Sequence, residues 1–388
     1  MKKLFLFGCI GLMLFEFSNM YFIMPMPGSQ QWNTLPLAYF LHSNRWVFRI
    51  LLSIPLIVGL IKGRWTKKFH VVLPLLLLSA IVFVIQNIMA ADAMFQQPKS
   101  IFLSQASKNK VDKNRLVIGV TMGNISKAYP IQFLGYHHFV YDTLGGQEIL
   151  VTYCTVCRTG RVYSPIVDGK KQDFRLVGMD HFNAMIEDKT THSWWQQATG
   201  EAVAGPLKGK QLSEIPSFQT SLATWIQQYP NTLIMQADVE FQDHYDTLFR
   251  YENGKSRKSL TGTNPQSGTP KSWVVGLKRN RTTAYIDWNE LKRKRIVQTT
   301  MDQMPVFVVI SKDNKSFFAF ENPHASAPEC INNIIRIKAN SNPSERKDPN
   351  ENIHTYQLNG QGINHQERLK PVRAYQEFLH SWNQFSQP

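Results

Sequence analysis

Residues 148–160 read EILVTYCTVCRTG, and this stretch carries more information about fold and chemistry than any other. The β-branched and apolar run over 149–153 predicts a strand. A turn follows, and it contains Cys154 and Cys157, three positions apart. Two thiols at that spacing can bind one metal ion, form a small-ring disulfide or act as a redox pair.

Short alternating or β-branched runs lie on both sides of this stretch and predict a mainly β fold. Each run ends at a turn, and together they cover 116–122, 138–143, 148–153, 161–167 and 174–179. A few helices are expected beside the strands. The clearest covers 217–228, with Ser217 as its candidate N-cap, and a terminal helix is expected over 371–385.

The β region repeats itself at an offset close to 157 residues. The tripeptide VIG at 117–119 recurs as VVG at 274–276, and AY at 128–129 recurs at 284–285. We interpret this as a duplicated β unit, with copies over about 115–235 and 272–330. The second copy has Ile310-Ser311 where the first has Tyr153-Cys154, so only the first carries the thiols.

The N-terminal region differs sharply from the rest in composition. Apolar spans cover 4–24, 46–61 and 71–90, and a span of about 20 such residues crosses a bilayer. We therefore expect three transmembrane α-helices in a membrane anchor over 1–94. A polar connector over 95–114 leads to the mainly β domain, 115–388. Glu16 and Arg49 fall at similar depth in two of the spans and are predicted to pair.

Basic residues indicate the orientation of this anchor. Lys2 and Lys3 precede the first span, and four more cations fill the loop between the second and third spans. The positive-inside rule predicts a multi-pass inner-membrane protein with a cytoplasmic N-terminus. Three crossings would place the large domain in the periplasm or an equivalent extracytoplasmic space. No signal-peptide cleavage site is evident after the first span.

Net charge narrows the class of partner. The chain carries a formal charge of +15, and 35 of its 43 Lys and Arg residues follow Met94. A basic domain outside the cytoplasm favours membrane lipid or an envelope protein as partner and argues against nucleic acid.

The cysteine pair leaves several chemical interpretations open. A metal site would need further ligands, and His138 and His181 are the best candidates beside Cys154 and Cys157. Such a soft or borderline set suits copper or zinc. Thiol–disulfide redox work would need a nearby cation, for which Arg158 and His138 are candidates. The remaining interpretation is a structural disulfide or an inert pair.

A competing hypothesis from another class is a non-catalytic envelope protein that binds a ligand or partner. The aromatic and polar stretch 194–207 is its candidate site, with Glu201 as an acid. A buried tryptophan strand followed by a turn is the simpler interpretation of this stretch, and we favour it.

The soluble region resembles the bacterial family known as domain of unknown function 3179. The residues that carry the resemblance are Ala128-Tyr129-Pro130, the run 137–143 with Gly145-Gly146, 151–154 with Cys157, 195–202 and 204–207. The match is specific over about 116–235. Many relatives have glycine after the second cysteine, where this chain has Arg158. The resemblance implies a genuine domain and assigns no activity, as the family name states.

Overall fold

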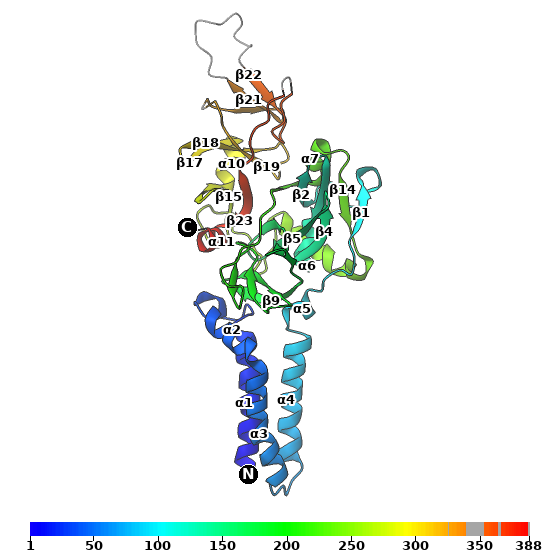
Figure 1. Ribbon diagram of the computed structural model, residues 1–388, viewed down its shortest axis with the longest axis vertical. Coiled ribbons are helices and arrows are strands. Elements are labelled where there is room, and N and C mark those ends of the chain that lie inside the picture. Colours follow the sequence, from blue (N-terminus) through cyan, green and yellow to red (C-terminus); the bar gives the residue numbers. More distant parts are fainter. Residues whose placement is uncertain (325, 339–352, 364–365, 387–388) are drawn as a thin grey trace, which may run out of the picture. The chain divides into compact units, whose positions relative to one another are not determined.

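The structure of the chain is a computed structural model that describes residues 1–324, 326–338, 353–363 and 366–386 (Figure 1). It divides into two compact units. Unit 1 comprises Met1–Gln97 and Ile166–Leu212, and unit 2 comprises Pro98–Pro165 and Ser213–Pro388. Residues 166–212, expected within the large β domain, therefore cluster with the N-terminal helices.

Helices dominate the N-terminal part of unit 1. The elements are α1 (Lys2–Tyr21), α2 (Leu35–Ser43), α3 (Arg45–Lys62), α4 (Phe69–Asn87) and the short α5 (Ala91–Met94). By length and composition α1 and α4 can each cross a membrane. The expected middle span is less clear, because α3 includes three cations and bends by 63° from α2. Three transmembrane helices were expected. The structure has two candidate spans, α1 and α4, and a third only if α2 and α3 together form one bent span.

Small residues allow α1 to lie close against α3 (Figure 1). A Cβ on Gly8 would be 2.5 Å from the backbone N of Leu56, and one on Gly59 would be 2.3 Å from the backbone N of Phe5. Close backbone approach at glycine is how helices associate where water supplies no hydrophobic drive.

An antiparallel sheet completes unit 1. Its strands, in the order β12-β11-β10-β9, are β9 (Phe174–Asp180), β10 (Asn183–Asp188), β11 (Trp194–Gln196) and β12 (Ala202–Ala204). A small hairpin, β7 (Ile166–Val167) with β8 (Lys170–Lys171), precedes it. The loop after α1 joins this sheet, since the Met179 N–H donates to the Ile23 carbonyl at 2.7 Å. Gly178 permits this approach, because a Cβ there would be 2.3 Å from that oxygen.

The first half of unit 2 builds two sheets. Strands β1 (Phe102–Gln105), β14 (Leu233–Gln236), β3 (Ile125–Pro130), β2 (Leu116–Met122) and β13 (Ser217–Ser221) form one, in that order. Strands β4 (Phe139–Leu144), β5 (Gln147–Cys154) and β6 (Thr159–Tyr163) form the other. Helix α6 (Ile131–His137) lies between β3 and β4 in the chain, and α7 (Leu222–Gln228) follows β13.

The second half of unit 2 has the corresponding elements. They are β15 (Trp273–Arg279), β16 (Thr282–Asp287), α10 (Trp288–Lys294), β17 (Ile296–Met301), β18 (Met304–Ile310), β19 (Phe317–Glu321), β23 (Arg373–Phe378) and α11 (Leu379–Phe385). A further sheet contains β20 (Glu329–Ile331), β21 (Ile334–Lys338) and β22 (Ile353–Tyr356). Short helices α8 (Gln242–Tyr245) and α9 (Phe249–Glu252) lie in the segment between the halves.

Contacts within the two halves recur at an offset of 157 residues. The Leu222 N–H donates to the Arg115 carbonyl at 2.9 Å, and the Leu379 N–H donates to the Ser272 carbonyl at 3.0 Å. A glycine in the first strand lies under a tryptophan in each half: Gly119 under Trp225 and Gly276 under Trp382. The recurrence therefore extends through α11, beyond the segment 272–330.

Two helix predictions were wrong in their first halves. Residues 217–221, expected as the start of a helix, instead form β13 and pair with β2. Ser221, not Ser217, caps α7 by accepting a hydrogen bond from the Thr224 N–H at 3.2 Å. The expected terminal helix 371–385 likewise begins as β23, which pairs with β15. In both cases pairing with a strand distant in the sequence outweighs local helical pattern.

Candidate functional site

The two predicted thiols lie at the turn between β5 and β6. Cys154 is the last residue of β5 and pairs with Thr159, the first residue of β6. Within the turn Arg158 has a φ of 60°. Glycine adopts this left-handed conformation at least cost, so an arginine here requires compensating contacts.

The sulfur atoms adjoin one another. The Cys157 N–H donates to Cys154 Sγ at 3.4 Å, and the two thiols are hydrogen-bonded. Both residues are fully buried and in the reduced form. Burial raises the pKa of the Cys157 thiol well above its ordinary value, and the hydrogen bond to Cys154 raises it further. At neutral pH Cys157 is therefore protonated and Cys154 is the acceptor.

A half-buried ammonium, that of Lys271, and the hydroxyl of Ser381 flank the pair. Lys271 Nζ donates to the carbonyls of Val156, inside the thiol turn, at 3.2 Å and of Leu260 at 2.6 Å. Burial lowers the pKa of Lys271, while the two cysteines act in the opposite direction. Ser381, in α11, hydrogen-bonds Cys157 and lowers its thiol pKa. Thiol–disulfide chemistry would need a cation near the sulfurs, and Lys271 is a cation in that position.

Arg158 was expected to act on the thiols, but its guanidinium hydrogen-bonds to other groups. Its Nε donates to Gln376 Oε1 at 3.1 Å, and its Nη atoms donate to the carbonyls of Tyr251 and Glu252 at 3.0 and 2.8 Å. The guanidinium also lies 3.6 Å from the centre of the Trp273 ring. These contacts compensate the strained backbone of Arg158 and tie the thiol turn to the rest of unit 2.

His138, a predicted ligand, is buried directly before β4. Its Nδ1 lies 3.1 Å from the Tyr136 carbonyl, and its own carbonyl accepts from the Tyr153 N–H at 2.7 Å. Burial lowers the pKa of His138 to about 4, so the imidazole is neutral at pH 7. A neutral imidazole is the form that binds metals.

His181, the fourth predicted ligand, belongs to unit 1, whereas the other three belong to unit 2. It follows β9, and its Nδ1 lies 2.8 Å from Asp180 Oδ1. This hydrogen bond raises the pKa of His181, with burial acting in the opposite direction.

The turn that corresponds to the thiol turn in the second half contains no sulfur. Residues 311–316 join β18 to β19, as residues 154–159 join β5 to β6. Here Asp313 accepts hydrogen bonds from Ser221 Oγ at 2.7 Å and from Thr224 Oγ1 at 2.9 Å, and so fixes the start of α7. In the thiol turn the Cys157 carbonyl accepts from the Phe378 N–H, at the start of α11. The scaffold can therefore form this turn without cysteine.

Unit 1 contains a separate, partly open chamber of about 330 Å³. Its walls combine apolar side chains with the carboxylates and cations of Glu16, Asp92, Glu187, Arg45, Arg49 and Arg175. Arg175 Nε donates to Glu187 Oε1 at 2.9 Å, and its Nη1 donates to Asp92 at 3.1 Å. Arg45 donates to the His42 carbonyl at 2.7 Å, and no carboxylate among the described residues pairs with it.

The stretch 194–207 is mainly structural. Trp194 and Trp195 are fully buried in β11, as the simpler interpretation predicted, and Glu201 is exposed. Trp194 supports the chamber, because its Nε1 donates to Glu187 Oε2 at 2.9 Å.

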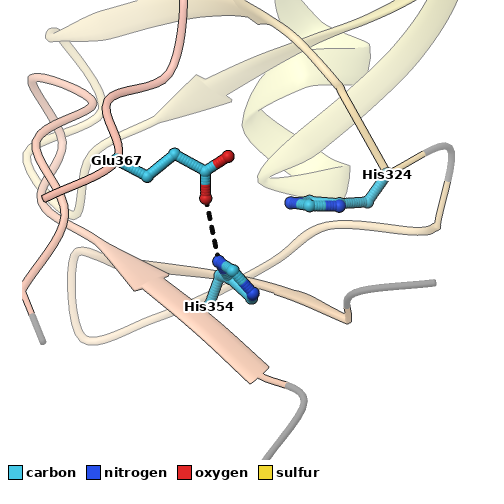
Figure 2. A group of neighbouring side chains, drawn as sticks. All are labelled: His324, His354 and Glu367. Carbon is cyan, nitrogen blue, oxygen red and sulfur yellow. Dashed lines mark hydrogen bonds and ion pairs between the residues drawn. The ribbon is translucent and has the colours of Figure 1, made fainter. Parts of the chain in front are cut away.

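Sequence reasoning missed another cluster, formed by His324, His354 and Glu367 in unit 2 (Figure 2). One potential ligand atom from each lies within 4.8 Å of the others. The residues are 30 and 13 positions apart, which matches no ligand-spacing motif.

One comparison with known proteins identifies a family for this chain. The model of the family described as "Protein of unknown function (DUF3179)" matches residues 95–388. No curated protein matches the chain. Among solved structures, the terminal oxygenase of carbazole 1,9a-dioxygenase from Nocardioides aromaticivorans IC177 is similar at 8% identity and a TM-score of 0.18, covering 68% of this chain and 75% of that one. Nothing about fold or chemistry follows from a score that low.

Proposed function

The chain belongs to the DUF3179 family, and from that premise we propose that it is a membrane-anchored protein that performs thiol–disulfide chemistry at Cys154 and Cys157. The observation that supports the proposal is the position of both cysteines in one turn, where the Cys157 N–H donates to Cys154 Sγ at 3.4 Å and Lys271 Nζ donates to the Val156 carbonyl at 3.2 Å. Because the corresponding turn at 311–316 forms without cysteine, the thiols are not needed to build the fold.

The proposed placement follows from the apolar helices and the distribution of cations. With α1, the α2–α3 pair and α4 as three crossings, Lys2 and Lys3 remain on the cytoplasmic side. The thiols would then lie in the extracytoplasmic space, where disulfides persist. A multi-pass inner-membrane protein of this kind would meet oxidants and disulfide partners from the envelope.

The proposed reaction is an exchange with a partner disulfide. Cys154 loses its proton and attacks one partner sulfur, which forms a mixed disulfide and releases one partner thiolate. Cys157 then loses its proton and attacks Cys154 Sγ, which releases the second partner thiolate. The chain loses two electrons and two protons, and the partner disulfide becomes two thiols. Because both sulfurs are buried, the turn must open before the partner can reach Cys154.

Lys271 and Ser381 would have separate effects on this reaction. The ammonium of Lys271 would stabilise a thiolate at either cysteine. The Ser381 hydroxyl donates to Glu377 Oε1 at 2.5 Å and would have to turn from that carboxylate to stabilise a thiolate of Cys157. Burial acts against thiolate formation and raises the pKa of the Cys157 thiol well above its ordinary value. The pair is therefore suited to slow, gated exchange rather than to rapid reaction with any passing disulfide.

Binding of a soft or borderline metal by the same thiols is the alternative chemistry. Both sulfurs lie at one hairpin turn, and His138 is neutral, so copper or zinc could take thiolate and imidazole ligands there. Metal analysis of the full chain in detergent micelles distinguishes metal binding from thiol–disulfide chemistry. Stoichiometric copper or zinc that Cys154→Ser removes would favour the metal site over the redox pair.

Mass spectrometry of the full chain tests the redox proposal. After equilibration with oxidised dithiothreitol, we expect the intact mass to fall by two hydrogens and two alkylation sites to disappear. Either Cys154→Ser or Cys157→Ser should abolish the change, whereas Cys330→Ser, a control in β20, should leave it intact. Thiols that remain alkylatable under every oxidising condition would rule out the proposal.

The chamber of unit 1 favours a second candidate function, ligand binding without catalysis. Its mixed lining and Arg45, which pairs with no carboxylate in the described ranges of the chain, suit an amphiphile with an acidic head group, such as an anionic lipid. Native mass spectrometry in micelles with added phosphatidylglycerol provides the test. We expect a bound lipid that Arg45→Gln weakens and that Lys68→Gln, at an exposed cation, does not. If both variants bound the lipid equally well, the chamber would be excluded as the lipid-binding site.

A further inference from the structure

We propose that His324, His354 and Glu367 bind one divalent transition-metal ion, with zinc as the best chemical fit. The three side chains come from different parts of the second half of unit 2. His324 lies in the turn after β19, His354 lies in β22, and Glu367 follows in the segment that leads to β23. This site is separate from the thiols and does not depend on the redox proposal.

The donor set is one that zinc uses. Two imidazole nitrogens and one carboxylate oxygen are the protein ligands of many catalytic zinc centres, at distances of about 2.0–2.2 Å. Ligand atoms around a tetrahedral ion at those distances are about 3.3 Å apart. The three atoms here already lie within 4.8 Å of one another, so side-chain movements of up to about 1.5 Å would complete the geometry.

The His354 and Glu367 side chains are already in contact. His354 Nδ1 lies 2.9 Å from Glu367 Oε2, and the ring of His324 lies beside this pair with one nitrogen directed toward it (Figure 2). The rings of His324 and His354 are 4.9 Å apart, centre to centre. An ordinary ion pair would need only His354 and Glu367, so the position of His324 is the feature that distinguishes a metal site.

His324 supplies independent evidence. Its Nε2 is buried and, within the described part of the chain, has no hydrogen-bond partner. A buried polar atom without a partner destabilises the fold, and a metal ion would satisfy it. The His324 backbone is held in place, because its N–H donates to Asn322 Oδ1 at 3.2 Å. The turn thus holds the backbone of His324 beside the other two ligands.

A tyrosine supports the carboxylate from behind. Tyr356 is fully buried, and its hydroxyl donates to Glu367 Oε2 at 3.0 Å. Hydrogen bonds of this kind orient metal ligands and tune their affinity.

The site is open to solvent on one side. The side chains of Glu367 and His354 are 45% and 31% exposed. Three protein ligands leave a fourth position for water or an external ligand, as in zinc centres that exchange ligands. The structure thus fits an accessible, exchangeable ion better than a closed structural zinc.

Metal titration of the full chain in detergent micelles tests this assignment. The protein is first stripped with a chelator and then titrated with Zn²⁺ by calorimetry and with Co²⁺ by visible spectroscopy. The background variant is Cys154→Ser with Cys157→Ser, which removes the thiols as ligands. We expect one equivalent of Zn²⁺ to bind to this background, with cobalt bands that lack a thiolate charge-transfer transition.

Single substitutions then identify the ligands. His324→Gln, His354→Gln and Glu367→Gln should each weaken binding by more than about 100-fold, and Tyr356→Phe by about 10-fold. His192→Gln, at an exposed histidine in unit 1, should have no effect. Circular dichroism of each variant checks that it is folded. Unchanged affinity in His324→Gln, or no stoichiometric binding to the background variant, would overturn the assignment.

Discussion

Arg49 in α3 donates hydrogen bonds to both carboxylate oxygens of Glu16 in α1, from Nε at 2.6 Å and from Nη2 at 3.0 Å. This bidentate ion pair, predicted from the sequence, joins the two helices that also approach through Gly8 and Gly59. Because the pair lies between two apolar helices, each charge needs the other for compensation.

Removal of one charge from this pair should destabilise the helical anchor strongly. Breaking a buried ion pair costs about 3–5 kcal/mol, because the remaining charge is left without compensation. We expect Glu16→Gln and Arg49→Gln each to lower the thermal unfolding temperature of the full chain in micelles. The charge-swapped double variant should recover much of the loss, and a swap no better than either single variant would contradict the pairing.

A second buried ion pair makes a comparable prediction in unit 2. Arg161 Nη2 lies 3.0 Å from Glu377 Oε2, and Glu377 is fully buried beside the thiol turn. Glu377→Gln should cost about 3–5 kcal/mol in the free energy of unfolding. The matched control is Glu290→Gln, which breaks an exposed pair with Lys294 and should cost less than about 1 kcal/mol. Denaturant titration of both variants compares the two costs.

The recurrent glycine–tryptophan contacts predict a steric defect in each half. A Cβ on Gly119 would be 2.3 Å from the Trp225 ring, and one on Gly276 would be 2.1 Å from the Trp382 ring. Overpacking of this kind costs about 1–3 kcal/mol, so Gly119→Ala and Gly276→Ala should both lower stability. In a double-mutant cycle Trp382→Leu should offset part of the Gly276→Ala cost. Strict additivity would show that the ring is not the obstacle.

Asp313 should make stability depend on acid pH. Burial raises its pKa, but hydrogen bonds from Ser311, Ser316 and Ser221 outweigh burial and lower it to about 2. A pKa below the unfolded value of 3.8 means that folding favours the carboxylate. The resulting stabilisation, about 2 kcal/mol, is present above pH 4 and is lost as pH falls from about 4 to 2.

Unfolding measurements at several pH values test this assignment. The free energy of unfolding of the natural chain should fall over that window by more than that of Asp313→Asn. Equal slopes for the two proteins would mean that Asp313 does not titrate as described.

Local sequence pattern predicted the strands well and the helices less well. The alternation over 116–122 matches β2, because its pairing partner β3 lies directly after it in the chain. Residues 217–221 have a helical pattern but form β13, because β2, about a hundred residues earlier, supplies hydrogen-bond partners. The clustering of 166–212 with the N-terminal helices depends on equally distant contacts, such as that between Met179 and Ile23.

In the candidate sites too, residues close together in the sequence could be predicted, and residues far apart in the sequence could not. Cys154 and Cys157 could be identified from spacing, since both thiols fall in one turn. Lys271 and Ser381 could not, because each lies more than a hundred residues from the thiols in the sequence. The cluster of His324, His354 and Glu367 leaves no spacing signal, because three separate segments of the fold bring it together.

The most direct test of the thiol account is an equilibrium redox titration of the full chain in micelles. The protein is incubated in dithiothreitol buffers of graded potential, alkylated and weighed by mass spectrometry. We predict one two-electron transition, with a tenfold change in the disulfide-to-dithiol ratio for every ~30 mV, that either Cys154→Ser or Cys157→Ser abolishes. If the two thiols of the natural chain never pair at any potential, the account is contradicted.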